Sequence, residues 1–130
     1  MSARFLLDTS VIIWTLEGSS RVSARAKRAL FEPANHLFVS VVSVWEIMLK
    51  RQTGKLELNA ALGQTLDLII RESPWTTLAL APEVLRLLAE MPLLHKDPFD
   101  RLLVAQAQHE ELTILTPDAR IVKYDVPTLW

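Results

Sequence analysis

Five acidic side chains stand at positions where an α/β fold could gather them for chemistry. Asp8 directly follows an apolar run, and Glu46 lies near the start of an apolar helical stretch. Asp97 and Asp100 open a second such stretch, and Asp118 follows a short apolar run across a Thr-Pro pair. Carboxylates with apolar neighbours are costly to bury unpaired, and several of them close together repel one another. A divalent cation relieves both problems, so the pattern indicates a metal site.

The residue types narrow the metal and its chemistry. An all-oxygen ligand set, without cysteine or clustered histidine, suits Mg²⁺ or Mn²⁺, which keep several waters and reach substrate phosphates. A metal held in this way activates water and neutralises charge on a phosphodiester oxygen. Phosphodiester hydrolysis is therefore the natural prediction, although the carboxylates alone also fit phosphatases and phosphoacceptor domains.

Each acid also has a purely structural explanation, and for any one acid taken alone that explanation is the stronger. Asp8, Asp97 and Asp118 each stand where a side chain can cap the helix that follows. Asp100 would suit the positive end of the helix dipole in a first turn. Glu46 has a lysine four residues later, the usual spacing of a helical ion pair.

Short apolar runs alternate with helical patterns along the chain. We predict strands over residues 4–7, 36–40, 76–80 and 112–115, with an edge strand at 128–130. The predicted helices cover residues 9–16, 23–31, 42–52, 60–71, 82–90, 98–110 and 118–124. This alternation is typical of an α/β fold: a single domain over residues 1–130, with a central, mostly parallel sheet of four to five strands and helices on both faces. The crevice beyond the carboxyl ends of such strands is where ligands bind, and the acids fall there.

Composition excludes several classes of function. The 130 residues include 50% hydrophobic and 22% charged residues with a net charge of −1, which predicts a globular domain without overall attraction to nucleic acid. The absence of cysteine excludes disulfides, zinc–thiolate sites and cysteine nucleophiles, and fits a reducing compartment. No uncharged apolar run is long enough to span a membrane, and we expect a soluble, cytoplasmic protein. The basic run RVSARAKR, at residues 21–28, is interpreted as a solvated helix face.

Four blocks of the sequence also resemble those of a known protein family. They are distributed over residues 5–130 and read FLLDTSVIIW, SVVSVWEIMLKRQTGKLEL, HKDPFDRLLVAQA and LTPDARIVKYDVPTLW. In this order and spacing the chain resembles the PIN-domain ribonucleases, specifically the VapC-like toxins of type II toxin–antitoxin systems. The resemblance implies a PIN-like α/β domain. It also implies that the catalytic, metal-binding residues are Asp8, Glu46, Asp100 and Asp118.

Within these blocks, several neighbours of the four acids take supporting roles. The third block places Asp100 before an apolar-then-alanine stretch, as the family pattern requires, which leaves Asp97 as the helix cap or a supporting acid. Ser10 and Thr116 are candidate hydroxyls for orienting carboxylates or water. An ordinary turn or cap is an equally good interpretation of both hydroxyls.

The resemblance also implies an activity and partners. The expected activity is that of an endoribonuclease dependent on Mg²⁺ (or Mn²⁺), in which ions held by Asp8 and Asp100, with Glu46 and Asp118 nearby, activate a water that attacks the phosphodiester in line. The expected partners are an RNA substrate, a second copy of the chain in a homodimer, and a cognate antitoxin that inserts a segment into the acidic groove. A higher assembly with the antitoxin is compatible with this expectation.

Two other classes of protein compete with the nuclease hypothesis. A phosphoacceptor receiver needs an acidic pair after the first strand, but Asp8 is followed by Thr9 and Ser10. The alternative that stays open is a catalytically inactive PIN-like module that only binds a protein partner. Two residues of the third block also keep open roles. His95 is interpreted as structural, and Arg101 either pairs with an acid or contacts RNA.

Overall fold

The computed structural model describes residues 2–130, except for the side chain of Ala61. Within this range the chain forms one five-stranded sheet in the order β3-β2-β1-β4-β5, with all neighbouring strands parallel. The strands are β1 (Arg4–Leu7), β2 (His36–Ser40), β3 (Thr76–Leu78), β4 (Thr113–Leu115) and β5 (Thr128–Leu129). The predicted α/β class, the parallel sheet and the edge strand at the end of the chain are confirmed.

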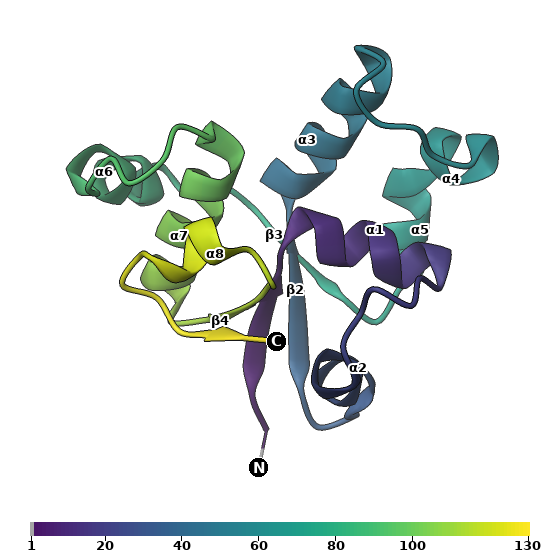
Figure 1. Ribbon diagram of the computed structural model, residues 1–130, viewed down its shortest axis with the longest axis horizontal. Coiled ribbons are helices and arrows are strands. Elements are labelled where there is room, and N and C mark those ends of the chain that lie inside the picture. The colour runs from purple at the N-terminus through teal and green to yellow at the C-terminus, as the bar shows by residue number, and fades with distance from the viewer. Residues whose placement is uncertain (1) are drawn as a thin grey trace.

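Helices cover both faces of this sheet (Figure 1). On one side lie α6, α7 and α8, and on the other lie α1, α2 and α5, while α3 extends from the end of β2. The helices are α1 (Thr9–Glu17), α2 (Ala24–Phe31), α3 (Val41–Gln52), α4 (Ala60–Gln64), α5 (Leu66–Glu72), α6 (Pro82–Glu90), α7 (Pro98–Glu110) and α8 (Ala119–Val122). None of the helices in the described part of the chain combines the length and the apolar character needed to cross a bilayer.

The two faces of the sheet have separate cores, as the alternation of side chains along a strand requires. Phe5 and Leu7 of β1 pack on the side of α1, α2 and α5, whereas Leu6 between them packs on the side of α6, α7 and α8. In β4, Ile114 and Leu115 divide in the same way. Because β1 is central and buried on both faces, the backbone at its end is held firmly, and that end carries Asp8.

The structure contains two helices, α4 and α5, where a single helix was predicted. The amphipathic pattern of residues 60–71 predicts a single helix, but the chain breaks at Thr65, whose backbone leaves the helical region (φ −122°, ψ 21°). Gly63 weakens the first segment because glycine disfavours helix interiors, and the Arg51 side chain lies where a Cβ of Gly63 would be. The break allows Leu66 and Ile70 to enter the core from α5.

The remaining differences from the predicted elements are at their ends. β3 stops at Leu78, two residues before the predicted end, and Leu80 is exposed beside the start of α6. The last helix is shorter than predicted and spans only Ala119–Val122. α1 ends one residue later than predicted, at Glu17, because Gly18 takes the left-handed conformation (φ 66°), in which a side chain is strained.

Candidate active site

Asp8 lies at the carboxyl end of β1 and points its charge into the interior. Its backbone N–H donates to the carbonyl of Leu115 (3.1 Å), which continues the pairing of β1 with β4. The residue occupies the N-cap position of α1, but its side chain accepts no capping hydrogen bond. Instead, Asp8 Oδ2 accepts a 2.7 Å hydrogen bond from the Thr116 hydroxyl, and only 4% of Asp8 is exposed. The capping explanation of Asp8 is therefore wrong.

Thr116 also links Asp8 to the fourth acid. Its hydroxyl oxygen accepts a hydrogen bond from the backbone N–H of Asp118 (3.0 Å). The Asp118 carboxylate caps α8 by accepting from the Arg120 backbone N–H (2.9 Å), and it also pairs with the Arg120 guanidinium (2.8 Å). Hydrogen bonding by Arg120 lowers the pKa of Asp118 and so favours its ionised form.

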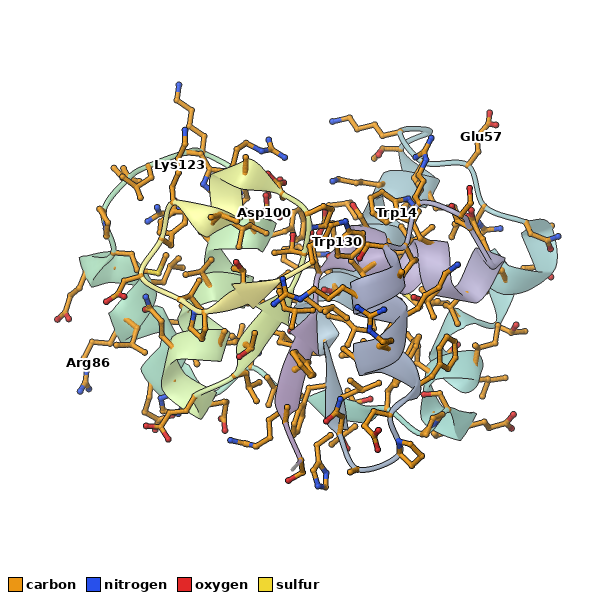
Figure 2. The ribbon with its side chains drawn as sticks, turned by 60° about the horizontal axis from the view of Figure 1, so that its bottom comes forward. Trp14, Glu57, Arg86, Asp100, Lys123 and Trp130 are labelled. Atoms are coloured by element: carbon orange, nitrogen blue, oxygen red, sulfur yellow. The ribbon has the colours of Figure 1, made fainter. Side chains whose placement is uncertain are left out.

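The two aspartates of the third block have different surroundings. Asp97 Oδ1 accepts hydrogen bonds from the backbone N–H groups of Phe99 (2.9 Å) and Asp100 (3.2 Å), so its predicted capping role at the start of α7 is confirmed. Asp100 lies within the first turn, is 6% exposed, and faces His95, whose Nε2 is 3.2 Å from its Oδ2. Figure 2 labels Asp100, which lies in the first turn of α7.

Glu46 reaches the same region from the first turns of α3. It forms the ion pair with Lys50 that its spacing predicts, but this is not an ordinary surface pair, because Glu46 is 4% exposed. Its second oxygen, Oε1, is buried and has no hydrogen-bond partner among the described residues. Burial opposes the charging of Lys50, but the contact with Glu46 outweighs it and raises the Lys50 pKa. The cluster thus holds a buried carboxylate oxygen with an unused lone pair.

An aromatic pair stands at the border of this cluster. Trp45 precedes Glu46, is 55% exposed, and packs edge-on against Phe99 with 4.9 Å between ring centroids. The Lys50 ammonium lies 6.0 Å from the centroid of the Phe99 ring. Trp45 therefore lies outside the core, and its ring remains largely accessible to solvent.

The carboxylates affect one another's protonation. The pKa of Asp8 is raised from 3.8 to about 6, mainly by burial and in part by the charges of Asp118 and Glu46, while the Thr116 hydrogen bond opposes the rise. The pKa of Asp100 is raised to about 8, mainly by burial and in part by repulsion from Asp97, Asp8, Glu46 and Asp118. The four acids that the resemblance names, together with Asp97, therefore lie within electrostatic reach of each other at one edge of the sheet.

This arrangement fits a divalent cation that prefers oxygen ligands. The donors are carboxylate oxygens, one of them buried without a partner, and the mutual repulsion would be relieved by a positive ion. As the described side chains stand, no three of them are close enough to enclose an ion. Two cations of the chain contact the acids instead, Lys50 at Glu46 and Arg120 at Asp118, with Arg120 also 3.9 Å from Asp100. Asp8, Glu46, Asp100 and Asp118 are the residues that would hold the metal.

The two hydroxyl residues that follow Asp8 have different surroundings. Ser10 is exposed, whereas its neighbour Thr9 is buried and donates to the Ser43 hydroxyl (2.9 Å), joining α1 to α3 below the acids. Arg120 was missed altogether. The only signal for it was its position two residues after Asp118, where a side chain can fold back onto a cap.

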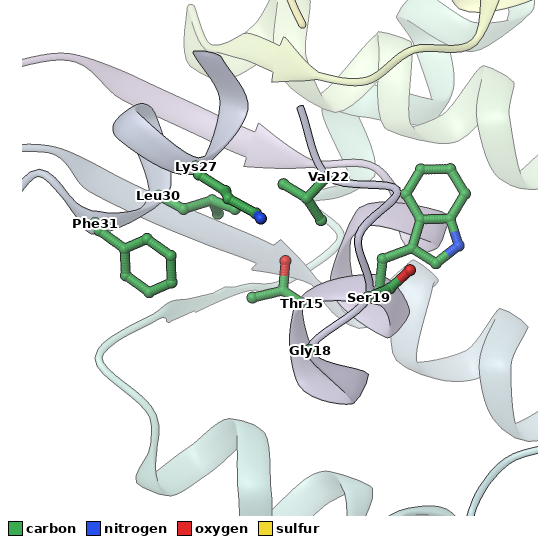
Figure 3. A pocket seen from close by; sticks show the side chains of 8 residues that line it. Thr15, Gly18, Ser19, Val22, Lys27, Leu30 and Phe31 are labelled. Atoms are coloured by element: carbon green, nitrogen blue, oxygen red, sulfur yellow. The ribbon is translucent and has the colours of Figure 1, made fainter. Parts of the chain in front are cut away.

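A separate hollow of about 270 Å³ lies away from the acids, beside α1 and α2 (Figure 3). Its walls are mainly apolar, with Trp14, Val22, Leu30 and Phe31 among the lining residues. Lys27 lies at the border of this hollow and is exposed, like Arg21, Arg25 and Arg28, so the interpretation of the basic run as a solvated face is confirmed.

Comparison with known proteins shows the family. The PIN domain family model matches residues 5–127. VapBC2 from Rickettsia felis, solved with a DNA fragment from its promoter, has a TM-score of 0.73 at 14% identity, over 97% of each chain. FitAcB from Neisseria gonorrhoeae has a TM-score of 0.70 at 21% identity, over 97% of this chain and 96% of its own.

A toxin-antitoxin complex from Klebsiella pneumoniae has the same fold, with a TM-score of 0.64 at 18% identity over 96% of this chain and 95% of its own. No curated protein matches the chain in sequence. The family match nevertheless extends from the middle of β1 to the residue before β5 and includes all four acids of the site. This chain belongs to the PIN domain family.

Proposed function

We propose that this chain is an endoribonuclease that depends on Mg²⁺ or Mn²⁺ and acts as the toxin of a type II toxin–antitoxin pair. The observation that carries the proposal is the electrostatic state of the acidic cluster. Asp8 and Asp100 have strongly raised pKa values, and Glu46 keeps a buried oxygen without a partner. Such a cluster is unfavourable without a cation, and strongly perturbed carboxylates at the crevice of an α/β sheet are typical of functional sites.

Each acid has its own role in this proposal. Asp8 is the most firmly positioned, because β1 holds its backbone and Thr116 holds its carboxylate. Asp100 lies within electrostatic reach of Asp8 at the start of α7, and Glu46 and Asp118 would complete the ligand set from α3 and from the segment after β4. A divalent ion bound there would supply an activated water and would neutralise charge on the scissile phosphodiester.

Two cations of the chain stand beside the acids and are suited to the phosphate backbone of RNA. The Arg120 side chain is 58% exposed at Asp118, and Lys50 lies against the accessible Trp45–Phe99 pair. Arginine and lysine contacts to phosphate hold a nucleic acid in register, whereas exposed aromatic rings stack on unpaired bases. We assign Arg120 and Lys50 to the RNA backbone and Trp45 to a base.

The partner proposal follows the structural relatives. One of them is described as a toxin-antitoxin complex, and two others carry the paired names VapBC2 and FitAcB. We propose that this chain likewise has a cognate antitoxin, which inserts a segment into the acidic groove and blocks it. We also propose a homodimer in the cytoplasm, with a larger assembly when the antitoxin is bound.

Cleavage of total RNA by the purified protein tests the enzyme. The chain is incubated with Mg²⁺, with Mn²⁺ or with EDTA, and the RNA ends are mapped by sequencing. Discrete cuts that need the metal and disappear in Asp8→Asn and Asp100→Asn are expected. Asp97→Asn is the matched control, because asparagine also caps a helix. This variant should cut, and if it fails while Asp100→Asn cuts normally, the ligand assignment within the third block is wrong.

Metal binding separates the nuclease from the interaction module. Calorimetry with Mn²⁺ should show binding to the wild type and a large loss of affinity in Asp8→Asn. Absence of binding, together with absence of cleavage, would favour a PIN-like module that only binds protein.

Partner binding is tested by expressing the chain together with the protein encoded next to it. Copurification and loss of cleavage would support the antitoxin proposal, and light scattering of the chain alone would give the mass of the predicted dimer.

A further inference from the structure

Four side chains form a continuous line of contacts that ends at Asp100. Arg101 Nη1 donates to the hydroxyl oxygen of Tyr124 (3.0 Å), and this hydroxyl lies 2.8 Å from His95 Nδ1. His95 Nε2 lies 3.2 Å from Asp100 Oδ2. The participants are largely removed from water, with Tyr124 at 5% and Arg101 at 7% exposure. The line joins the α6–α7 loop, the start of α7 and the segment after α8.

The chemistry of its first member gives the line a direction. A guanidinium has only donors, so the Tyr124 oxygen must accept from Arg101. The phenolic proton then remains available for donation to a lone pair on His95 Nδ1. A neutral imidazole that accepts at Nδ1 carries its own proton on Nε2. That proton faces Asp100 Oδ2, so each hydrogen bond in the line runs from donor to acceptor toward the carboxylate.

Arg101 is therefore not a counterion of the acidic cluster. Its remaining contacts are to backbone carbonyls, with Nη1 2.8 Å from the oxygen of Pro92 and Nη2 3.5 Å from that of Leu88. Both carbonyls belong to the end of α6 and the loop that leads to His95. Neither of the two sequence interpretations of Arg101, pairing with an acid or contact with RNA, agrees with these contacts. Arg101 instead fixes Tyr124 and the loop on which His95 stands.

We propose that His95 is a positioning residue for Asp100, held in the Nε2–H tautomer by the hydroxyl of Tyr124, which Arg101 orients. The role rests on the proposed metal-dependent function, in which Asp100 is a metal ligand. By fixing one carboxylate oxygen, the imidazole restricts the rotation of Asp100 and prepares the other oxygen to bind an ion. Groups that hold ligands in this way typically contribute 10- to 100-fold to metal affinity.

The tautomer is read directly by NMR of the metal-free full chain with ¹⁵N-labelled histidine, at about pH 8.5, where an ordinary imidazole is neutral. The chain contains three histidines, and the signals of His95 are those missing from His95→Gln. We expect His95 to carry its proton on Nε2 in the wild type and to lose this preference in Tyr124→Phe. A proton on Nδ1, or on both nitrogens, in the wild type would overturn the proposal.

Metal affinity tests the consequence of this positioning. Glutamine places an amide N–H close to the position of imidazole Nε2, whereas alanine leaves Asp100 Oδ2 without this donor. Mn²⁺ calorimetry should show about 10-fold or greater weakening in His95→Ala and recovery of most of the affinity in His95→Gln. Equal losses in the two variants, with unfolding temperatures in EDTA like that of the wild type, would show that His95 acts only through packing.

A double-mutant cycle tests whether Tyr124 acts through His95. If it does, Tyr124→Phe weakens Mn²⁺ binding in the wild type but has little further effect in His95→Ala. Additive losses would contradict the line of contacts. The tautomer experiment requires neither metal nor RNA, so its result stands even if the protein proves not to be a nuclease. Absence of Mn²⁺ binding by the wild type, by contrast, would count against the proposed function and against the positioning role that rests on it.

Discussion

The hydroxyl of Thr116 donates a 2.7 Å hydrogen bond to Oδ2 of Asp8, although 108 residues of chain separate the two. Parallel pairing of β1 with β4 brings them together, because Asp8 and Thr116 each follow the last residue of a strand. The contact is buried and is the strongest influence that favours the ionised form of Asp8. It therefore couples the geometry of the sheet to the charge of the candidate metal site.

Removing this hydroxyl should make Asp8 harder to ionise. In Thr116→Val the shape is nearly kept but the donor is lost, so the pKa of Asp8 should rise above its value of about 6. The Asp8 carboxyl carbon, followed by ¹³C NMR across a pH series without metal, measures the change. Thr116→Ser retains the hydroxyl and should titrate like the wild type. An unchanged Asp8 titration in Thr116→Val would show that the contact does not govern the charge.

Without metal, the protein should lose stability as the pH rises. The folded-state pKa values of Asp8, about 6, and Asp100, about 8, both exceed the ordinary value of 3.8, so the folded chain binds these protons more tightly than the unfolded chain. The free energy of unfolding should then fall between pH 4 and pH 8, by roughly 3 kcal/mol from Asp8 alone at about 1.4 kcal/mol per pKa unit. Urea unfolding in EDTA at several pH values measures this slope.

The Asp100→Asn variant is the control for this dependence of the free energy of unfolding on pH. Asp100→Asn removes the repelled carboxylate without changing the size of the side chain, so the variant should be more stable than the wild type near pH 8 in EDTA. Saturating Mn²⁺ should stabilise the wild type through binding to the folded state and should stabilise the variant less. A wild type that is most stable at alkaline pH would show that the carboxylates are not repelled as described.

Arg120 should compete with the metal. Its guanidinium contacts Asp118 and lies 3.9 Å from Asp100, and its hydrogen bond is the main reason that the Asp118 pKa is lowered. In Arg120→Ala the pKa of Asp118 should rise, and Mn²⁺ should bind a few-fold more tightly because no fixed cation repels it. Arg120→Lys, which keeps the charge, should bind Mn²⁺ nearly as the wild type does. Weaker binding in Arg120→Ala would instead mean that Arg120 orients Asp118 for the ion.

Two substitutions of Asp97 should separate its role as a helix cap from its electrostatic effect on Asp100. Asp97→Ala loses both hydrogen bonds to the first turn of α7 and should lower the free energy of unfolding by about 1 kcal/mol. Asp97→Asn keeps a cap and should cost less, but it removes the charge that most strongly repels Asp100. The pKa of Asp100 should consequently fall in both variants, as ¹³C NMR would show. A fall in the alanine variant alone would trace the effect to helix fraying.

Local patterns predicted those parts of the site that depend on neighbouring residues. The apolar run before Asp8 predicts a buried strand with an acid at its end, and Asp97 followed by proline predicts a cap at the start of a helix. The parallel order of the strands follows from their alternation with helices, and it brings the acids to a single edge. The capping of Asp97 and the five-stranded sheet could therefore be predicted without coordinates.

Contacts between side chains that are distant in the sequence could not be predicted in this way. Nothing around His95 indicates that Tyr124, 29 residues later, would meet its ring, because this depends on how α8 folds back over α7. The break at Thr65 was missed because the apolar periodicity continues through it. Arg120 was missed because its sequence neighbours describe a helix start, whereas its function depends on the carboxylates that the fold brings to it.

The central strand of the sheet is made early in translation, and one of its two partners, β4, is made only after β2, β3 and α7. When β1, β2 and β3 have left the ribosome, Asp8 and Glu46 are present, but Asp100 and Asp118 are still to come. At synthesis rates of roughly 5–20 residues per second, the segment from β3 to Asp118 takes several seconds. The strand order therefore postpones assembly of the candidate metal site until the second half of the chain has been synthesised.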